Sequence, residues 1–208
     1  MTVIQGSPEW FAQRLGKVTA SRLADVMAKG KGDSEAATRA TYRAELVAER
    51  LTNKAAEGFT NAAMKWGTEC EPLARAAYEA EYGLLVTETG MVTHPRISMS
   101  GASPDGLVSI DGLIEIKCPE TKAHIDTILS GEAPSKYIPQ MQWQMACTGR
   151  AWCDFVSFDP RMPVDMQMFV RRVLRDDDLI NAYEAEVLAF LAEVDATVMK
   201  LKAWKQAA

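Results

Sequence analysis

Three ionisable side chains in the stretch 101–118 (GASPDGLVSIDGLIEIKC) have the types and spacing of a metal site. Glu115 and Lys117 are separated by one residue, so on an extended strand they share a face, roughly 7 Å apart along the backbone. Asp105 lies upstream and can supply a second carboxylate. Two carboxylates, the backbone carbonyl of Ile116 and water form the oxygen-rich site that Mg²⁺ and Mn²⁺ prefer. A neighbouring lysine can orient a metal-bound water and offset charge that develops on a phosphate.

A β-hairpin is predicted to bring the two carboxylates together. Asp111-Gly112 has the composition of a two-residue type I′ turn between two apolar strands. With that turn, Asp105 pairs with Cys118 and points to the face opposite Glu115. The carboxylates then meet only if the first strand bends, and we expect a bulge or kink at Gly106. The same residues also fit a plain surface hairpin, because the D…E-x-K spacing is short and common.

Other metal chemistries have little support in the sequence. The chain has two histidines, His94 and His124, which is a weak basis for a His-based metal site. Its four cysteines show no C-x-x-C spacing and have apolar neighbours, so we expect buried free thiols, not zinc ligands or disulfides. Any catalysis must therefore rest on carboxylates.

Four ordered sequence blocks resemble one nuclease family. SPDGL at 103–107 followed by EIK at 115–117 resembles the PD-(D/E)XK nuclease superfamily. Together with RLGKVTAS at 14–21, WGTECEPLAR at 66–75 and QMQWQM at 140–145, it is similar to the phage lambda exonuclease family, also called YqaJ-like viral recombinases. The resemblance spans about residues 8–160 and implies a restriction-endonuclease-like fold.

The resemblance also implies a catalytic centre. Glu71, and not Glu69, matches an additional active-site acid of the family, for a second metal or an outer contact. Gln140 matches a glutamine beside the active centre, although two glutamines on one helical face are usually solvated. Asp105, Glu115 and the carbonyl of Ile116 would hold Mg²⁺, for which Mn²⁺ can substitute, and Lys117 would position the attacking water. The implied catalytic residues are Asp105, Glu115, Lys117 and Glu71.

A second cluster near the N-terminus suits an anion. Ser7-Pro8 is a helix start, and a second short helix is expected from Thr19 to about Met27. Their junction places Arg14 near hydroxyls and free backbone amides. From the residues alone, Ser21 is a helix N-cap. By resemblance, Arg14, Ser21 and Ser103 form a pocket for a terminal 5′-phosphate.

Composition is that of a soluble globular protein, with 48% hydrophobic and 25% charged residues in 208. No apolar run reaches transmembrane length and the N-terminus lacks a signal-peptide core, so we expect a cytoplasmic protein without membrane contact. The net charge of −5 at first argues against a nucleic-acid partner, but residues 1–54 carry nine Lys/Arg and six Asp/Glu. A local basic surface is predicted from Arg14, Lys17, Arg22, Lys29, Lys31, Arg39 and Arg43.

Hydrophobic periodicity predicts one α/β domain over residues 1–208, with a central mixed sheet flanked by helices. Long helices are expected at about 35–52 and 176–202, with buried stripes that include Leu51 in the first and Leu191 in the second. The remaining helices are predicted at Asn61–Gly67, 68–82, 120–130 and 139–147. The strands are predicted at 84–93, with an interruption at Gly90, and at 107–110, 113–117, 152–158 and 164–173.

The family resemblance implies a Mg²⁺-dependent exonuclease that digests linear double-stranded DNA 5′→3′ from 5′-phosphorylated ends and leaves 3′ single strands. It further implies a homotrimeric ring that works beside a single-strand annealing protein in phage recombination, inside the bacterial host. One alternative is another PD-(D/E)XK enzyme, either an endonuclease or a single-strand exonuclease. A second is a non-catalytic DNA-end-binding module, against which the intact Asp105, Glu115 and Lys117 argue.

Overall fold

A five-stranded mixed sheet carries the predicted catalytic stretch. The computed structural model describes residues 3–32, 34–55 and 62–207. The strand order is β2-β5-β6-β7-β8, in which β6 and β7 are parallel and the other pairs antiparallel. A smaller sheet, β1-β4-β3, lies beside it. The strands are β1 Val18–Thr19, β2 Val86–Thr87, β3 Val92–Thr93, β4 Ser100–Ala102, β5 Gly106–Val108, β6 Gly112–Lys117, β7 Trp152–Phe158 and β8 Met168–Leu174.

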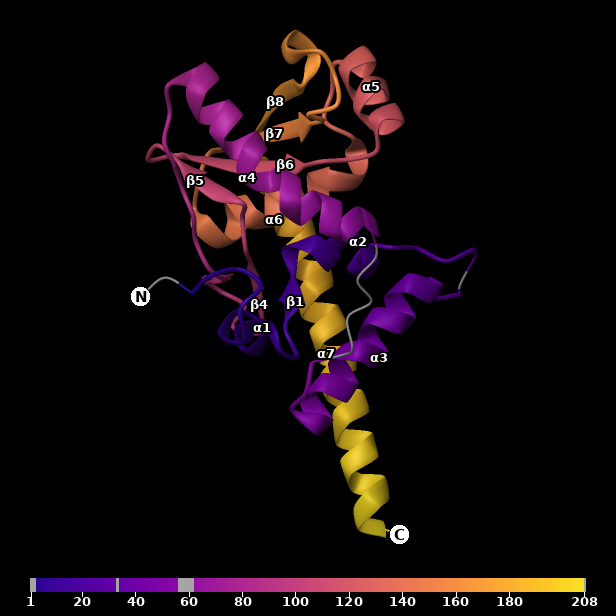
Figure 1. Cartoon of the computed structure of the whole chain (residues 1–208). Helices are drawn as coiled ribbons and strands as arrows, with labels where there is room; N and C mark the ends of the chain where they lie inside the picture. Colours follow the sequence, from indigo (N-terminus) through magenta and orange to yellow (C-terminus); the bar gives the residue numbers. More distant parts are fainter. Residues whose placement is uncertain (1–2, 33, 56–61, 208) are drawn as a thin grey trace.

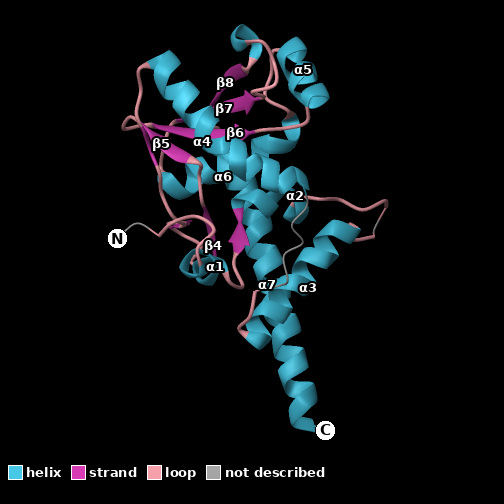
Figure 2. Cartoon of the chain, in the orientation of Figure 1, coloured by secondary structure: helices cyan, strands magenta, loops and turns pink. Residues whose placement is uncertain are grey.

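Helices cover both faces of the larger sheet (Figures 1 and 2). One face packs against α4, where Ala74 and Tyr78 meet Ile114 and Ile116. The other packs against α6, which buries two methionines against Leu113. The helices are α1 Pro8–Arg14, η1 Ala20–Arg22, α2 Leu23–Val26, α3 Ala37–Thr52, α4 Ala62–Tyr82, α5 Thr121–Ser130, η2 Ser135–Tyr137, α6 Ile138–Thr148, η3 Val164–Met166 and α7 Asp177–Ala207.

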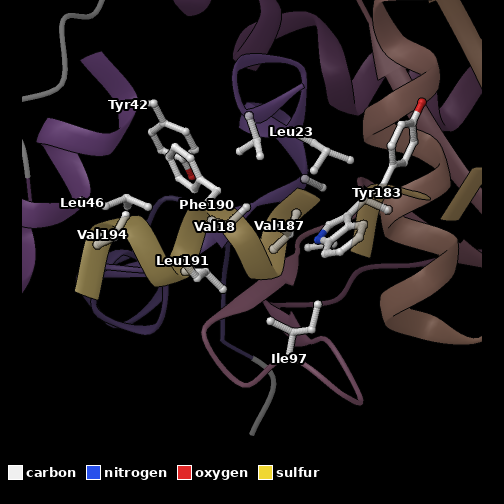
Figure 3. Close-up of a cluster of buried hydrophobic side chains, with 14 of the residues drawn as sticks. Val18, Leu23, Tyr42, Leu46, Ile97, Tyr183, Val187, Phe190, Leu191 and Val194 are labelled. Carbon is white, nitrogen blue, oxygen red and sulfur yellow. The ribbon is translucent and has the colours of Figure 1, made fainter. Parts of the chain in front are cut away.

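The C-terminal helix α7 organises a second core. Its apolar stripe packs against α2, α3 and the smaller sheet, and Figure 3 shows Phe190 beside Tyr42. The two rings stack with centroids 5.6 Å apart. The remainder of α7 extends away from the body of the molecule (Figure 1). The predicted long helix at 176–202 is thus confirmed and continues to Ala207.

Several predicted details are wrong. The helix through 68–82 does not begin at Thr68, because α4 continues through Gly67 and Pro72 as one helix of 21 residues. Leu51 on α3 is 40% exposed and does not belong to the buried stripe. The predicted strand 84–93 is two short strands in different sheets, and the backbone of Val3 passes against Gly90 between them. The predicted cap Asn61 lies outside the described residues.

The hairpin register differs from the predicted one. Gly106 pairs with Ile114 and Leu107 with Leu113, so a three-residue loop, 109–111, joins β5 to β6. One further step places Asp105 opposite Glu115. The predicted pairing of Asp105 with Cys118 is wrong by an odd number of residues, and an odd shift exchanges the faces of a strand. This register brings the two carboxylates to one face without a bulge inside β5, and the chain bends at Asp105, one residue before the predicted kink at Gly106.

Close packing explains the two hairpin glycines. A Cβ at Gly106 would lie 2.1 Å from Cγ1 of Val86 on the neighbouring strand. A Cβ at Gly112 would lie 2.1 Å from ring atoms of Trp152, whose other contacts include the Arg172 guanidinium 3.6 Å from the ring centroid. Gly112 is thus the first residue of β6 and makes room for an indole, whereas the sequence suggested a type I′ turn residue.

We expect Gly112→Ala to lower the free energy of unfolding by about 1–3 kcal/mol, because the indole held by Arg172 must shift. The matched control is Gly67→Ala within α4, where a Cβ meets no atom within 4 Å. That change should stabilise the protein by about 0.5–1 kcal/mol, since alanine favours the helix. Urea unfolding measures both values, and shifts of the same sign would contradict the packing account.

Candidate active site

The centre of the site is a pair of carboxylates, Asp105 directly before β5 and Glu115 on the adjacent strand β6. Asp105 Oδ2 accepts a hydrogen bond from the backbone N–H of Ile116 at 2.6 Å. Glu115 is fully buried, and Lys117 Nζ donates to its Oε1. Burial and the charge of Glu115 raise the pKa of Asp105 well above its usual range. Burial by itself lowers the pKa of Lys117, but Glu115 and Asp105 outweigh it and the pKa is raised.

Two glutamines from α6 hold the buried carboxylate. Gln140 donates from Nε2 to Glu115 Oε1 and Gln144 donates from Nε2 to Glu115 Oε2, both at 2.6 Å. The structure thus places Gln140 at the predicted site. Gln144, which the sequence analysis missed as a site residue, is fully buried, and its Oε1 lacks a hydrogen-bond partner among the described residues. Its spacing of four residues from Gln140 was the available signal.

A third acid lies on α4. Glu71 forms a salt bridge with Arg75 at 2.7 Å, and Arg75 also donates to the backbone carbonyl of Asp105 at 3.2 Å. Burial raises the pKa of Glu71, Arg75 opposes this, and the charge of Glu115 adds to it. Glu69 is exposed. The structure therefore holds Glu71, and not Glu69, within electrostatic reach of the carboxylate pair.

The three predicted phosphate ligands meet in space. Arg14 donates to Ser103 Oγ at 3.3 Å and to Ser21 Oγ at 3.4 Å. Trp10, which the sequence analysis did not select, donates from Nε1 to Ser103 Oγ at 2.9 Å and lies under the Arg14 guanidinium, 4.1 Å from its ring centroid. Burial lowers the pKa of Arg14. In the described part of the chain Arg14 has no salt bridge, so its charge is available to an anion.

Ion pairs remove much of the predicted basic surface. Arg22 is paired with Asp25 at 2.5 Å and with Glu45 at 2.8 Å. Arg39 and Arg43 both bind Glu193, at 2.8 and 2.7 Å. The cations of that surface that form no salt bridge among the described residues are Arg14, Lys17, Lys29 and Lys31.

The donors at the centre fit a hard divalent cation. Asp105, Glu115 and the carbonyl of Ile116 offer only oxygen. Burial and then the charge of Glu115 raise the pKa of Asp105, and a cation would offset that negative charge. Among the described residues, no three His, Cys, Asp or Glu side chains stand together as a metal-binding group. Such an ion would therefore need water or a phosphate oxygen to complete its coordination.

Histidine and cysteine take no part in this centre. His94 and His124 are buried at other positions, with 3% and 0% exposure. The four cysteines are free, as predicted, and three of them are buried while Cys118 is half-buried.

A mixed sheet whose central strand carries Glu-x-Lys beside an aspartate has the arrangement of the PD-(D/E)XK nuclease class. The family model of the YqaJ-like viral recombinase domain matches residues 9–151. The chain therefore belongs to the YqaJ-like viral recombinase family, which confirms the resemblance read from the sequence blocks.

Solved structures agree with this assignment. The alkaline exonuclease LHK-Exo from Laribacter hongkongensis is 57% identical, with a TM-score of 0.90 over 97% of this chain and 99% of that one. LHK-Exo in complex with dAMP gives the same identity and coverage and a TM-score of 0.91. A phage related exonuclease from Haemophilus somnus 129PT, 18% identical, shares the fold, with a TM-score of 0.69 over 89% of this chain and 96% of that one. No curated protein matches the sequence significantly. No helix in the described ranges is long and apolar enough to cross a membrane.

We expect Gln144 to be coupled energetically to Glu115. Replacing Gln144 by Met removes a hydrogen bond to a buried charge, so it should cost about 1.5–3 kcal/mol more in the wild type than in a Glu115→Gln background. Urea unfolding of the two single variants and the double variant, in EDTA at neutral pH, measures this difference.

The matched control is Gln142→Met on the same helix, because Gln142 is equally buried but donates to the carbonyl of Leu174. Gln142→Met should lower the free energy of unfolding by the same amount in the wild type and in the Glu115→Gln background. An equal cost of Gln144→Met with and without the Glu115 charge would show that the amide only fills space.

Proposed function

We propose that this chain is a divalent-metal-dependent exonuclease that digests linear double-stranded DNA from 5′-phosphorylated ends and leaves 3′ single strands. The observation that carries the proposal is the proximity of two unlike sites. Ser103, which accepts hydrogen bonds from Arg14 and Trp10, precedes Asp105 of the carboxylate pair by two residues. An anion pocket next to a hydrolytic centre selects a phosphorylated end over an internal position.

In the proposed reaction, the oxygen of a water bonds to phosphorus and the bond from phosphorus to the 3′-oxygen of the terminal nucleotide breaks. Asp105, Glu115 and the carbonyl of Ile116 would hold Mg²⁺, for which Mn²⁺ can substitute. When bound, such an ion supplies Lewis-acid stabilisation of the phosphate and of the leaving oxygen. Lys117 orients the attacking water, and Glu71 serves a second metal or an outer contact.

The remaining site residues fix the substrate. Arg14, Ser21 and Ser103 bind the terminal 5′-phosphate, and Gln140 lies beside the reacting centre. The complex of LHK-Exo with dAMP supports a nucleoside monophosphate as a ligand of such a site.

The direct test is a linear duplex with a 5′-phosphate at one end and a 5′-hydroxyl at the other, incubated with Mg²⁺ or EDTA. The wild type should degrade the phosphorylated end in Mg²⁺ only. Lys117→Ala should reduce the rate about 10²–10⁴-fold. Arg14→Ala should lower the rate of degradation from the phosphorylated end about 10- to 100-fold and so remove the preference between ends.

One exposed residue provides a control. Arg171→Ala removes a side chain that is 49% exposed, and this variant should behave as wild type. Equal loss from both ends in the wild type would remove the phosphate pocket from the proposal. Cutting of closed circular DNA or a preference for single strands would favour another PD-(D/E)XK activity. No degradation in any metal would favour a DNA-end-binding module.

We further propose a homotrimeric ring that acts beside a single-strand annealing protein, in phage-type recombination in the cytoplasm of a bacterial host. The part of α7 that leaves the body supports self-association, because it exposes Met199, Leu201 and Trp204, the last by 71%. Light scattering should give three times the 22.9 kDa of one chain. A mass of one chain, with and without DNA, would contradict the ring.

A further inference from the structure

A cavity of about 390 Å³ opens beside Lys117. Its floor is formed by Phe155 and Ser157 of β7, and its walls by α5 and the η2 turn. The cavity lies on the β7 side of β6, whereas Arg14 bonds to Ser103, which precedes β5 on the other side of β6. Its volume is within the range of about 300–1,000 Å³ that is typical of small-ligand sites.

The lining combines an aromatic surface with two cations. Tyr137 stacks on Phe155 with ring centroids 5.6 Å apart. Lys117 Nζ and Lys136 Nζ lie 5.1 and 4.8 Å from the Tyr137 ring centroid. The one acid in the lining, Asp126, is paired with Lys122 outside the cavity at 2.7 Å. Aromatic rings and ammonium groups in one cavity match a flat base attached to a phosphate.

The walls are held in place before any ligand arrives. Asp159, the residue after β7, is buried and accepts a hydrogen bond at 2.6 Å from Oγ1 of Thr121, the first residue of α5. On the next turn, the buried His124 bonds to Ser157 Oγ at 2.8 Å and to the carbonyl of Met166 at 2.9 Å. A preformed cavity spares a ligand the cost of ordering its own binding site.

We propose that this cavity is a nucleotide subsite for the base of the second nucleotide of the 5′-ended strand. That nucleotide carries the scissile phosphate on its 5′-oxygen. With the terminal phosphate at Arg14 and the scissile phosphate at Asp105 and Glu115, the strand continues across β6 towards β7, where the cavity lies. The proposal rests on the exonuclease function and adds to it a contact that fixes the strand on the 3′ side of the cut.

The test uses Ala123, an exposed residue of α5 that lines the cavity. Ala123→Glu places bulk and negative charge in the cavity, and Ala123→Met places bulk alone. The control is Leu129→Glu on the same helix, because Leu129 is 80% exposed and is not part of the lining. Equal thermal unfolding of the three variants and the wild type checks that the fold is retained.

The readout is the fluorescence of 2-aminopurine at the first or the second position of a 5′-phosphorylated duplex, with Ca²⁺ in place of Mg²⁺ to prevent hydrolysis. In the wild type, binding should quench the second position through stacking in the cavity. Ala123→Glu and Ala123→Met should abolish that quenching and weaken binding about 5- to 100-fold, the range for one lost base stack. Leu129→Glu should stay within about twofold of wild type.

Two results would overturn the subsite. One is quenching of the second position that survives both Ala123 substitutions. The other is an equal loss of binding in Ala123→Glu and Leu129→Glu, which would reflect general charge repulsion. If either result is obtained and the wild type still degrades phosphorylated DNA, the subsite is wrong but the exonuclease function stands. If the wild type neither binds nor degrades phosphorylated DNA, the exonuclease function itself is wrong.

Discussion

The arrangement of this molecule depends on a carboxylate that is buried in the central strand of its larger sheet. Glu115 has no solvent exposure, and an ionised carboxylate in such a position is costly unless donors surround it. Lys117, Gln140 and Gln144 provide those donors. The docking of α6 on the sheet and the course of the strand through Lys117 are therefore tied to one side chain.

Around this buried carboxylate, negative charges outnumber the positive charges that offset them. Asp105 faces Glu115 across the hairpin, and Glu71 adds a third negative charge within electrostatic reach. Lys117 offsets part of this charge, and Arg75 ties Glu71 to the backbone of Asp105. A protein selected for stability alone has no need of a raised carboxyl pKa at its centre, so the arrangement suits the binding of a cation.

The sequence predicted which residues lie together at the site better than it predicted their geometry. The alternation of β6 side chains between two faces, the helical stripe of α7 and the strand β7 follow directly from local periodicity, and all three are present. The register of the hairpin could not be predicted, because Gly112 has two uses that look identical in a sequence: a turn with positive φ, or room for a neighbouring ring. The partner of that glycine, Trp152, is forty positions away and becomes adjacent only in the folded sheet. Gln144 and Trp10 could not be identified as site residues from the sequence for the same reason, because their hydrogen-bond partners lie on other elements.

The predicted basic surface was inaccurate for a related reason. The sequence counts every arginine as a free cation, but folding pairs Arg22, Arg39 and Arg43 with acids on their own or neighbouring helices. Arg14 forms no such pair in the described chain and bonds to serine hydroxyls and an indole instead. A count of charges in a sequence therefore overstates the number of cations that a folded surface offers to an anion, because exposed ion pairs attract a polyanion weakly.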